Sequence, residues 1–290
     1  MESKASLMER FLFRIAKQWI AGDTMEQAIQ SARLANKKGM SAIINKLGEH
    51  LTSKNQVENT LKEYLVLVSN LRKSRVKGGI SVKPTQLGLA RSKKECLQNF
   101  LILIEKASLS QIFVWIDMES SEFTDGTIGI YLDLFDKYER LGLALQANLK
   151  RTRGDLMKLL ELGAKIRLVK GAYREKKETA YQSRNDVDEN YRNLMELLFV
   201  EGNEFGIATH DLQLIEHAIN LSKVHEKKFE FQMLKGIRDE LKPVLLKKGF
   251  PVMEYIPYGT NWLPYSIRRL KERKRNILLL GSSFLHSHRV

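Results

Sequence analysis

Short runs of β-prone residues alternate with stretches of helical periodicity along most of the chain. Eight such runs are predicted as strands: residues 41–47, 79–84, 112–117, 143–148, 166–170, 206–210, 229–234 and 252–257. Several of them, such as IFVWI, IRLV and GIAT, are continuously apolar, which is typical of parallel strands covered on both faces. Eight strands that are each followed by a helix predict an α/β protein of the (β/α)8 barrel type, whose usual size is about 250 residues.

The stretches between these runs are predicted as helices. They cover residues 55–73, 92–106, 127–140, 151–161, 187–203, 211–223, 237–248 and 262–273. Before the first strand, Thr24 with Gln27 three residues later has the pattern of a capping box that opens a helix at 25–35. A doubly wound open sheet is the alternative fold, but no G-x-G-x-x-G follows the first predicted strand.

The predicted organisation has three parts. Residues 1–40 form an N-terminal helical arm, residues 41–275 form the catalytic barrel, and residues 276–290 form a C-terminal tail. The helix after the last strand is expected to lie over the mouth of the barrel. The apolar tail is expected to pack against the barrel, with contact to a membrane or a partner as the alternative.

Composition narrows the class of protein. The 290 residues include 48 Lys plus Arg and 34 Asp plus Glu, a formal net charge of +14, and 43% are hydrophobic. This hydrophobic share supports a core and excludes wholesale disorder. Cys96 is the one cysteine in the sequence, so an internal disulfide and a cysteine-based zinc finger are excluded.

The positive charge is spread over short clusters along the chain. No zinc knuckle, RNP-type aromatic strand or basic heptad accompanies it, so nucleic acid is not expected as a partner. No apolar run approaches the roughly 20 residues of a spanning helix, and the N-terminus has the pattern of an amphipathic helix rather than a signal peptide. We expect a cytoplasmic protein, with peripheral contact at the inner face of a membrane left open.

Ionisable and polar residues gather at the carboxyl ends of the predicted strands, where barrel enzymes hold their active sites. They are Lys83, Asp117, Glu119, Gln146, Arg167, Lys170, Thr209, His210, Asp211, Gln232 and Tyr255. The helix after the last strand adds Arg268, Arg269 and Glu272. So dense a set at one rim favours an active site.

Two basic elements leave alternatives open. Arg268 and Arg269 suit a bidentate clamp for a substrate carboxylate, with Glu272 on the same helical face, or else a solvated basic helix. Lys170 suits a Schiff-base lysine, a cation beside a bound cofactor that the small residues after it allow to approach, or an ordinary charged loop.

A metal is not expected. His210 has no second and third ligand at a convincing spacing. Asp117 and Glu119 resemble a magnesium pair, but the basic residues around them favour ion pairing. The segment 209–211 ends a strand and opens a helix, which favours an anion at its backbone N–H groups.

Seven segments, in order along the chain, carry the motifs of a known family. They are SVKPTQLGL (81–89), WIDMES (115–120), LQANLKRT (145–152), RLVKGAY (167–173), ATHD (208–211), FEFQMLKG (229–236) and YIPYGTNWLPYSIRRLKER (255–273). The chain resembles the monofunctional proline dehydrogenases, flavin enzymes with a (β/α)8 barrel. Residues 20–39 are similar to the family's N-terminal arm, so the resemblance covers most of the chain.

The resemblance implies a role for each site residue. It places Arg268, Arg269 and Lys83 around the carboxylate of proline, with Glu272 supporting this cage. It implies that Tyr255 packs on the pyrrolidine ring and crowds out hydroxyproline, and that Leu234 forms an apolar wall. It makes Asp117, near the substrate, and Arg167, near the flavin N5, the catalytic residues. The implied FAD contacts are Met118, Gln146, Arg167, Lys170, Gly171, Ala172, Thr209, His210 and Gln232.

The implied activity is the oxidation of L-proline to Δ1-pyrroline-5-carboxylate, the first step of proline degradation to glutamate. Hydride passes to the flavin N5, and the electrons continue to a quinone. Pro84, Asn148, Arg174 and Asp211 depart from the family's pattern, and none of them belongs to the implied clamp. From the residues alone, a Schiff-base lyase or aldolase using Lys170 or Lys83 and a basic nucleic-acid-binding protein stay as alternatives.

Overall fold

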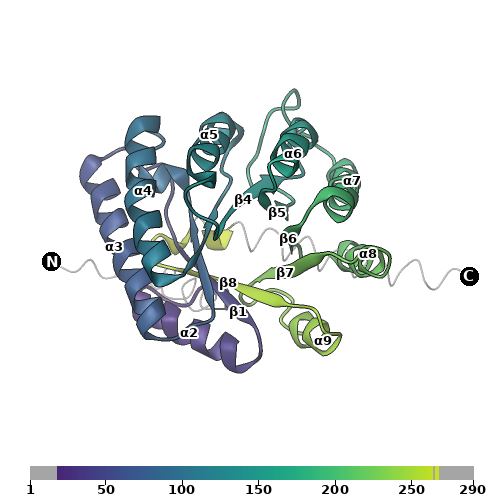
Figure 1. Cartoon of the computed structure of the whole chain (residues 1–290), viewed down its shortest axis with the longest axis horizontal. Helices are drawn as coiled ribbons and strands as arrows, with labels where there is room; N and C mark the ends of the chain where they lie inside the picture. The colour runs from purple at the N-terminus through teal and green to yellow at the C-terminus, as the bar shows by residue number, and fades with distance from the viewer. Residues whose placement is uncertain (1–17, 264, 268–290) are drawn as a thin grey trace, which may run out of the picture.

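A closed barrel of eight parallel strands forms the centre of the computed structural model, which describes residues 18–263 and 265–267 (Figure 1). The strands are β1 (Ser41–Lys46), β2 (Gly78–Val82), β3 (Phe113–Ile116), β4 (Leu141–Gln146), β5 (Lys165–Val169), β6 (Glu204–Ala208), β7 (Lys228–Leu234) and β8 (Val252–Tyr258). Each strand pairs with the next along the chain, and β1 pairs with β8 to close the sheet, Ile43 opposite Tyr255. The predicted (β/α)8 barrel is confirmed.

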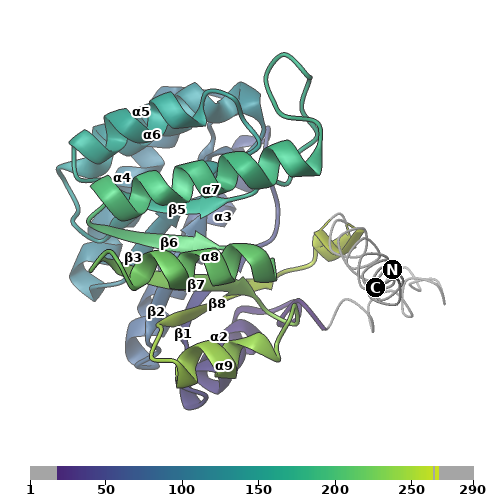
Figure 2. The same ribbon diagram turned by 90° about the vertical axis from the view of Figure 1, so that its right-hand side faces the viewer.

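Helices cover the outside of this barrel (Figures 1 and 2). They are α2 (Met25–Lys37), α3 (Lys54–Lys73), α4 (Lys93–Ser110), α5 (Thr124–Phe135), α6 (Thr152–Glu161), α7 (Arg184–Glu201), α8 (Leu212–Ser222) and α9 (Leu241–Lys247), with short 3-10 helices η1 (Pro84–Leu87) and η2 (Ser121–Phe123). Figure 2 shows the barrel from the side, with the segment after β8 at the end toward which the strand arrows point.

The barrel has an apolar outer layer and a polar interior at its carboxyl end. Successive side chains of a strand point to opposite faces. On β5, Ile166 and Leu168 are fully buried in the hydrophobic core. Arg167, between them, contacts polar side chains of other strands across the barrel. The alternation along one strand therefore separates the packing that stabilises the barrel from the groups available for chemistry.

Helix α2 packs against the barrel where β8 meets β1. The predicted capping box is confirmed: the Thr24 side chain accepts from the Gln27 N–H, and the Gln27 side chain accepts from the Thr24 N–H. Ala28, Ala32 and Ala35 of this helix are buried in the core. Their small side chains let the helix approach the strands closely.

Some predicted boundaries were wrong. The strand expected at 79–84 ends at Val82, because Pro84 opens η1 and proline lacks the N–H that a strand ladder needs. The helix expected at 127–140 covers 124–135. The helix expected at 237–248 begins at Leu241, because the chain first turns at Gly236, where φ is +70° and a Cβ would lie 1.8 Å from the Gln18 carbonyl oxygen.

The chain ends fall outside the residues that the structure describes. The predicted helix within 1–20 is described only from residue 18, and the tail at 276–290 is not described. The boundaries of the three predicted parts therefore stay predictions. Among residues 18–263 and 265–267, none of the helices combines the length and the apolar character needed to cross a membrane.

Candidate active site

A cavity of about 880 Å³ opens at the carboxyl ends of the strands, within the size range of small-molecule and cofactor sites. Thirteen of the residues to which the resemblance assigns a role line it: Lys83, Asp117, Met118, Gln146, Arg167, Lys170, Gly171, Ala172, Thr209, His210, Gln232, Leu234 and Tyr255. Asp211, predicted at the same rim, lines it as well. Asn261 and Tyr265, which follow β8, line it as well. Arg268, Arg269 and Glu272 lie outside the described residues. The structure thus brings the described residues of the predicted set together, while their individual roles stay predictions.

Asp117 is the centre of a polar network inside the barrel. Its Oδ1 accepts hydrogen bonds from Ser81 Oγ, at 2.6 Å, and from Arg167 Nη2. Its Oδ2 accepts from the Tyr255 hydroxyl, at 2.8 Å, and from Lys83 Nζ, at 3.4 Å. Donors from β2, the segment after β2, β5 and β8 therefore converge on one carboxylate. This carboxylate holds two cations and an aromatic ring in fixed positions at the cavity wall.

The same network controls the charge of Asp117. Burial alone raises its pKa, but the charges of Arg167 and Lys83, with the hydrogen bonds from Ser81 and Tyr255, outweigh burial and bring the pKa to about 2. The carboxylate is therefore ionised at neutral pH. A general base works best when its pKa is close to the operating pH, so Asp117 is better suited to hold cations in place than to remove a proton.

Arg167 is buried between two aromatic rings. Its guanidinium carbon lies 5.1 Å from the centre of the Trp115 ring and 5.7 Å from that of Tyr255, and the residue is 3% exposed. Its Nη groups donate to Asp117, Ser81 and Gln232, but its Nε has no hydrogen-bond partner among the described residues. A buried donor without an acceptor costs free energy. An acceptor atom on a bound ligand would remove that cost.

Gln146 offers the complementary feature, an acceptor without a donor. Its Nε2 donates to the carbonyl oxygens of Met118, at 3.1 Å, and Glu119, at 2.7 Å. These two bonds fix the amide so that Oε1 faces away from them, and within residues 18–263 and 265–267 this buried atom has no partner. Gln146 thus suits a ligand that presents an N–H or O–H to the cavity wall.

Gly171 lets the backbone line the cavity closely. Its φ is +106°, which side chains disfavour, and a Cβ there would lie 2.1 Å from Asn148 Oδ1. The neighbouring Asn148, one of the departures from the family's pattern, is 8% exposed. Glycine is therefore required at position 171 by both backbone geometry and space.

Lys170 belongs to a network of two cations and two carboxylates at the edge of the cavity. Its Nζ pairs with Asp188, on α7, and with Asp211 at 2.9 Å. Arg184 pairs with the same two carboxylates, at 3.3 Å and 2.9 Å. The Lys170 Nζ is thus held by two carboxylates, whereas a Schiff-base lysine must have its nitrogen free to attack a carbonyl. The geometry therefore favours a cation that faces a ligand over the aldolase alternative.

His210 is engaged in the fold. Its Nε2 accepts a hydrogen bond from the Leu234 N–H at 2.8 Å, so this nitrogen is not available to a metal. The bond ties the carboxyl end of β6 to that of β7, on the wall where Thr209 and Leu234 line the cavity.

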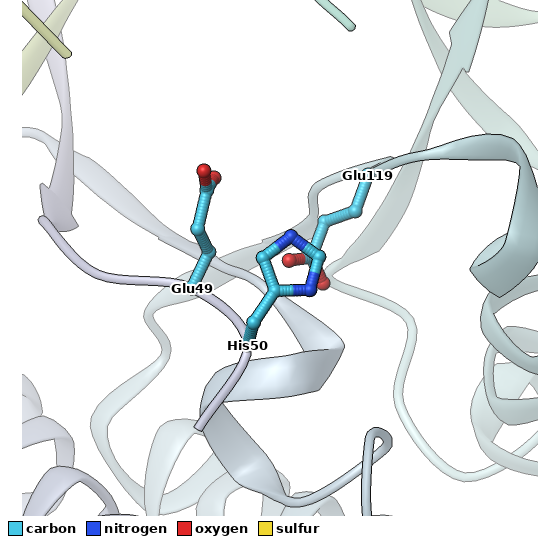
Figure 3. A group of neighbouring side chains, drawn as sticks. All are labelled: Glu49, His50 and Glu119. Atoms are coloured by element: carbon cyan, nitrogen blue, oxygen red, sulfur yellow. The ribbon is translucent and has the colours of Figure 1, made fainter. Parts of the chain in front are cut away.

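Glu49, His50 and Glu119 form a further cluster beside the cavity, with potential ligand atoms within 4.8 Å of one another (Figure 3). Both Glu119 oxygens already accept from Thr85, at 2.9 and 2.6 Å. Burial raises the pKa of Glu119, which the bonds from Thr85 partly offset. Glu49 Oε2 accepts from the Tyr173 hydroxyl at 2.7 Å. Protein donors thus occupy the carboxylates of this cluster, and a site without metal stays the prediction.

Sequence reasoning missed several residues that shape the site. Ser81 is fully buried between Asp117 and Arg167, and Trp115 lies under the Arg167 guanidinium. Asp188, near the start of the helix predicted at 187–203, also lines the cavity. The signal for Ser81 was its place in β2, two residues before Lys83 on the same strand face.

Comparison with known proteins identifies relatives over nearly the whole chain. The family profile described as proline dehydrogenase matches residues 28–279. The chain is 33% identical over 264 residues to Proline dehydrogenase 1 of Bacillus subtilis, covering 90% of this chain and 87% of that protein. It is 32% identical over 287 residues to Proline dehydrogenase of Deinococcus radiodurans, covering 96% and 93%.

Solved structures share the fold. Proline utilization A from Bdellovibrio bacteriovorus, in a structure inactivated by N-propargylglycine, superposes with a TM-score of 0.83 at 22% identity. The match covers 91% of this chain but 33% of that protein, so this chain spans about a third of its length. At this identity the likeness is one of fold.

Proposed function

The chain belongs to the proline dehydrogenase family and is an oxidoreductase that acts on proline, and we propose that it oxidises L-proline to Δ1-pyrroline-5-carboxylate by hydride transfer to a bound FAD. Proline oxidation is the first step of proline catabolism. The observation that carries the proposal is the convergence of Arg167, Lys83 and Tyr255 on the ionised Asp117 at the wall of the large cavity.

The described residues fit a flavin. Arg167 Nε lacks an acceptor and Gln146 Oε1 lacks a donor among the residues described, and a flavin ring system carries both kinds of atom. Gly171 lets the backbone approach a flat ring or a phosphate. The proposed FAD contacts are those implied by the family: Met118, Gln146, Arg167, Lys170, Gly171, Ala172, Thr209, His210 and Gln232. FAD, when bound, supplies the hydride acceptor.

The chain's own residues supply position and field. Arg167, 3% exposed, is proposed to stabilise negative charge that develops next to it. Lys83 is held by Asp117 within reach of a substrate carboxylate, with Arg268 and Arg269 as the proposed partners on the other side and Glu272 supporting them. Tyr255 and Leu234 line the cavity and are proposed to pack on the pyrrolidine ring. A misplacement of about 1 Å at the reacting carbon costs on the order of 100-fold in rate.

Asp117 does not act as the base in the proposed reaction. The ring nitrogen of proline must release its proton before its lone pair forms the C=N bond as the hydride leaves the neighbouring carbon. The pKa of Asp117, at about 2, lies far below that of an amine, so we propose that this proton goes to solvent.

Electrons are proposed to continue to a quinone. Quinones are dissolved in membranes, and the formal net charge of +14 supports attraction to an anionic membrane surface. We propose peripheral contact of this kind, without a spanning segment.

The visible spectrum tests the proposal. Protein purified with FAD should be yellow, and proline added without oxygen should bleach the flavin band. A colourless protein that takes up no FAD would refute the proposal.

The clamp is tested separately. Replacing Arg268 or Arg269 by Met should raise KM for proline steeply while FAD stays bound, whereas the matched change Arg275→Met should leave KM unchanged. Unchanged KM in all three variants would remove the clamp from the mechanism.

A further inference from the structure

A hydrogen-bonded row crosses the barrel interior from Arg167 toward the opposite mouth. Arg167 Nη1 donates to Gln232 Oε1 at 3.3 Å. Gln232 Nε2 in turn donates to Glu230 Oε1 at 2.7 Å. Gln232 and Glu230 are two residues apart on β7, so their side chains project from the same face of this strand. The row therefore connects the proposed flavin-side cation to a carboxylate at the amino end of the strands.

The barrel leaves space for this row at one glycine. Gly206 of β6 is in register with Arg167 on one side and with Glu230 on the other. A Cβ at Gly206 would lie 2.6 Å from Gln232 Nε2. The side chain of Gln232 thus fills the place that a larger residue at position 206 would occupy.

The two neighbours of Gln232 define one orientation of its amide. A guanidinium only donates, so the end of the amide that faces Arg167 must be the oxygen. The NH2 end then needs an acceptor, and an ionised carboxylate only accepts. A charged acceptor makes a stronger hydrogen bond than a neutral one, so an ionised Glu230 holds the NH2 end of Gln232 more firmly than a protonated Glu230 does. The charge on Glu230 therefore decides how firmly Gln232 is held in the orientation that Arg167 requires.

Glu230 faces a second cavity, of about 770 Å³, at the amino ends of the strands. The charged or titratable groups around it are Lys165 and Arg167 on β5, Glu204 on β6, Lys228 on β7, and His225, Glu226 and Lys227 before β7. Burial raises its pKa to about 7, with a further rise from Glu204, against the lowering effects of the bond from Gln232 and the charges of Arg167 and Lys165. A group in this position changes charge near neutral pH and can exchange its proton through the lower cavity.

We propose that Glu230 is a positioning residue: its ionised carboxylate fixes the amide of Gln232, which in turn fixes Arg167 for the reaction. The proposal rests on the proposed function, because Arg167 and Gln232 are the residues through which it acts. Glu230 thereby links the pH at the amino end of the barrel, where the second cavity opens, to Arg167 in the proposed active site at the carboxyl end.

Four variants test this link. Glu230→Gln keeps an oxygen that accepts from Gln232 but cannot ionise, so we expect its kcat/KM at every pH to match the acid-side value of wild type, about 3-fold below the alkaline-side value, with no limb near pH 7. Glu230→Leu removes the acceptor and should lower kcat about 10-fold, the effect of roughly one hydrogen bond to a charged network, and should weaken FAD binding as measured by titration of the apoprotein. The double variant Glu230→Leu/Gln232→Met should have a kcat no lower than that of Gln232→Met alone, because both changes break the same row of hydrogen bonds.

Glu204→Gln is the matched control. Glu204, the first residue of β6, lines the same second cavity. Its charge raises the pKa of Glu230, but it does not touch Gln232. This variant should keep the limb and move it to lower pH.

The proposal is overturned if wild type shows no limb near neutral pH, if Glu230→Gln keeps it, or if the effects of Glu230→Leu and Gln232→Met add. Should Glu230→Leu fail to fold, the pH profile of Glu230→Gln decides alone. Failure of the proposed function looks different, because wild-type protein would then bind no FAD or leave proline unoxidised.

Discussion

The raised pKa of Glu230 predicts a stability difference that depends on pH and needs no activity measurement. In the folded protein the pKa is about 7, against an ordinary value of 4.5. Between these two values the unfolded chain has released the proton and the folded chain retains it. A raised carboxyl pKa therefore makes the free energy of unfolding fall as pH rises from 4.5 to about 7. Below 4.5 both states are protonated, and above about 7 both are ionised, so the loss levels off at each end.

The size of this loss follows from the two values. At about 1.4 kcal/mol per pH unit, the full span gives about 3 kcal/mol. Glu230→Gln cannot ionise and avoids the loss. From pH 4.5 to pH 8, the free energy of unfolding of wild type should therefore fall by about 2–3 kcal/mol relative to that of Glu230→Gln.

Urea unfolding followed by circular dichroism measures this difference. FAD is removed beforehand so that its binding does not add a pH dependence of its own, and a second probe, tryptophan fluorescence, checks that unfolding is two-state. Glu204→Gln serves as the control. Loss of the Glu204 charge brings the pKa of Glu230 closer to its ordinary value, so the free energy of unfolding of this variant should fall less with pH than that of wild type. If plots of the free energy of unfolding against pH for wild type and Glu230→Gln stay parallel from pH 4.5 to 8, the reasoning is refuted.

Three further predictions follow from other parts of the structure. Lys242, 2% exposed, pairs with Glu254 at 2.7 Å, so Lys242→Met should lose about 3–5 kcal/mol by leaving a buried carboxylate unpaired; wild-type stability in urea would contradict this. Asp117→Asn should lower kcat/KM for proline at least about 10-fold, because Arg167 and Lys83 lose a charged partner; steady-state kinetics showing less than a 2-fold change would remove Asp117 from the mechanism. Gly171→Ala should weaken FAD binding in a titration, because the new Cβ would meet a neighbouring side chain and the backbone has φ +106°; unchanged affinity would show that this turn does not face the cofactor.

The fold could be predicted from the sequence because its signals are local and repeated. Apolar runs such as IRLV and the capping box at Thr24 each report on a few neighbouring residues. Eight repeats of strand and helix leave few topologies, and closure brings all carboxyl ends to one rim. Nine of the thirteen described site residues could be named for this reason, since position at a strand end is enough to place them around one cavity. The other four, Met118, Gly171, Ala172 and Leu234, were named through the resemblance to the family.

The contacts within the site could not be predicted, because they depend on side chains that meet across the barrel. Ser81 looked like an ordinary strand residue, and its partners Asp117 and Arg167 come from other parts of the barrel wall. Glu230 looked equally ordinary, and its link to Arg167 through Gln232 crosses from β7 to β5. Gly206 appeared only as a small residue in an apolar run, and its purpose follows from the side chain of Gln232 above it. Such information requires the register of neighbouring strands, which the sequence does not state.

The central claim is that this barrel holds proline against FAD beside Arg167. An anaerobic titration of the FAD-loaded protein with L-proline, read by flavin absorption and by assay of the product, tests it most directly. We expect saturating proline to bleach the flavin completely, with one Δ1-pyrroline-5-carboxylate formed per flavin reduced, and Arg167→Met to bleach far more slowly. Full bleaching of Arg167→Met at the wild-type rate, or a bound flavin that proline leaves oxidised, would contradict it.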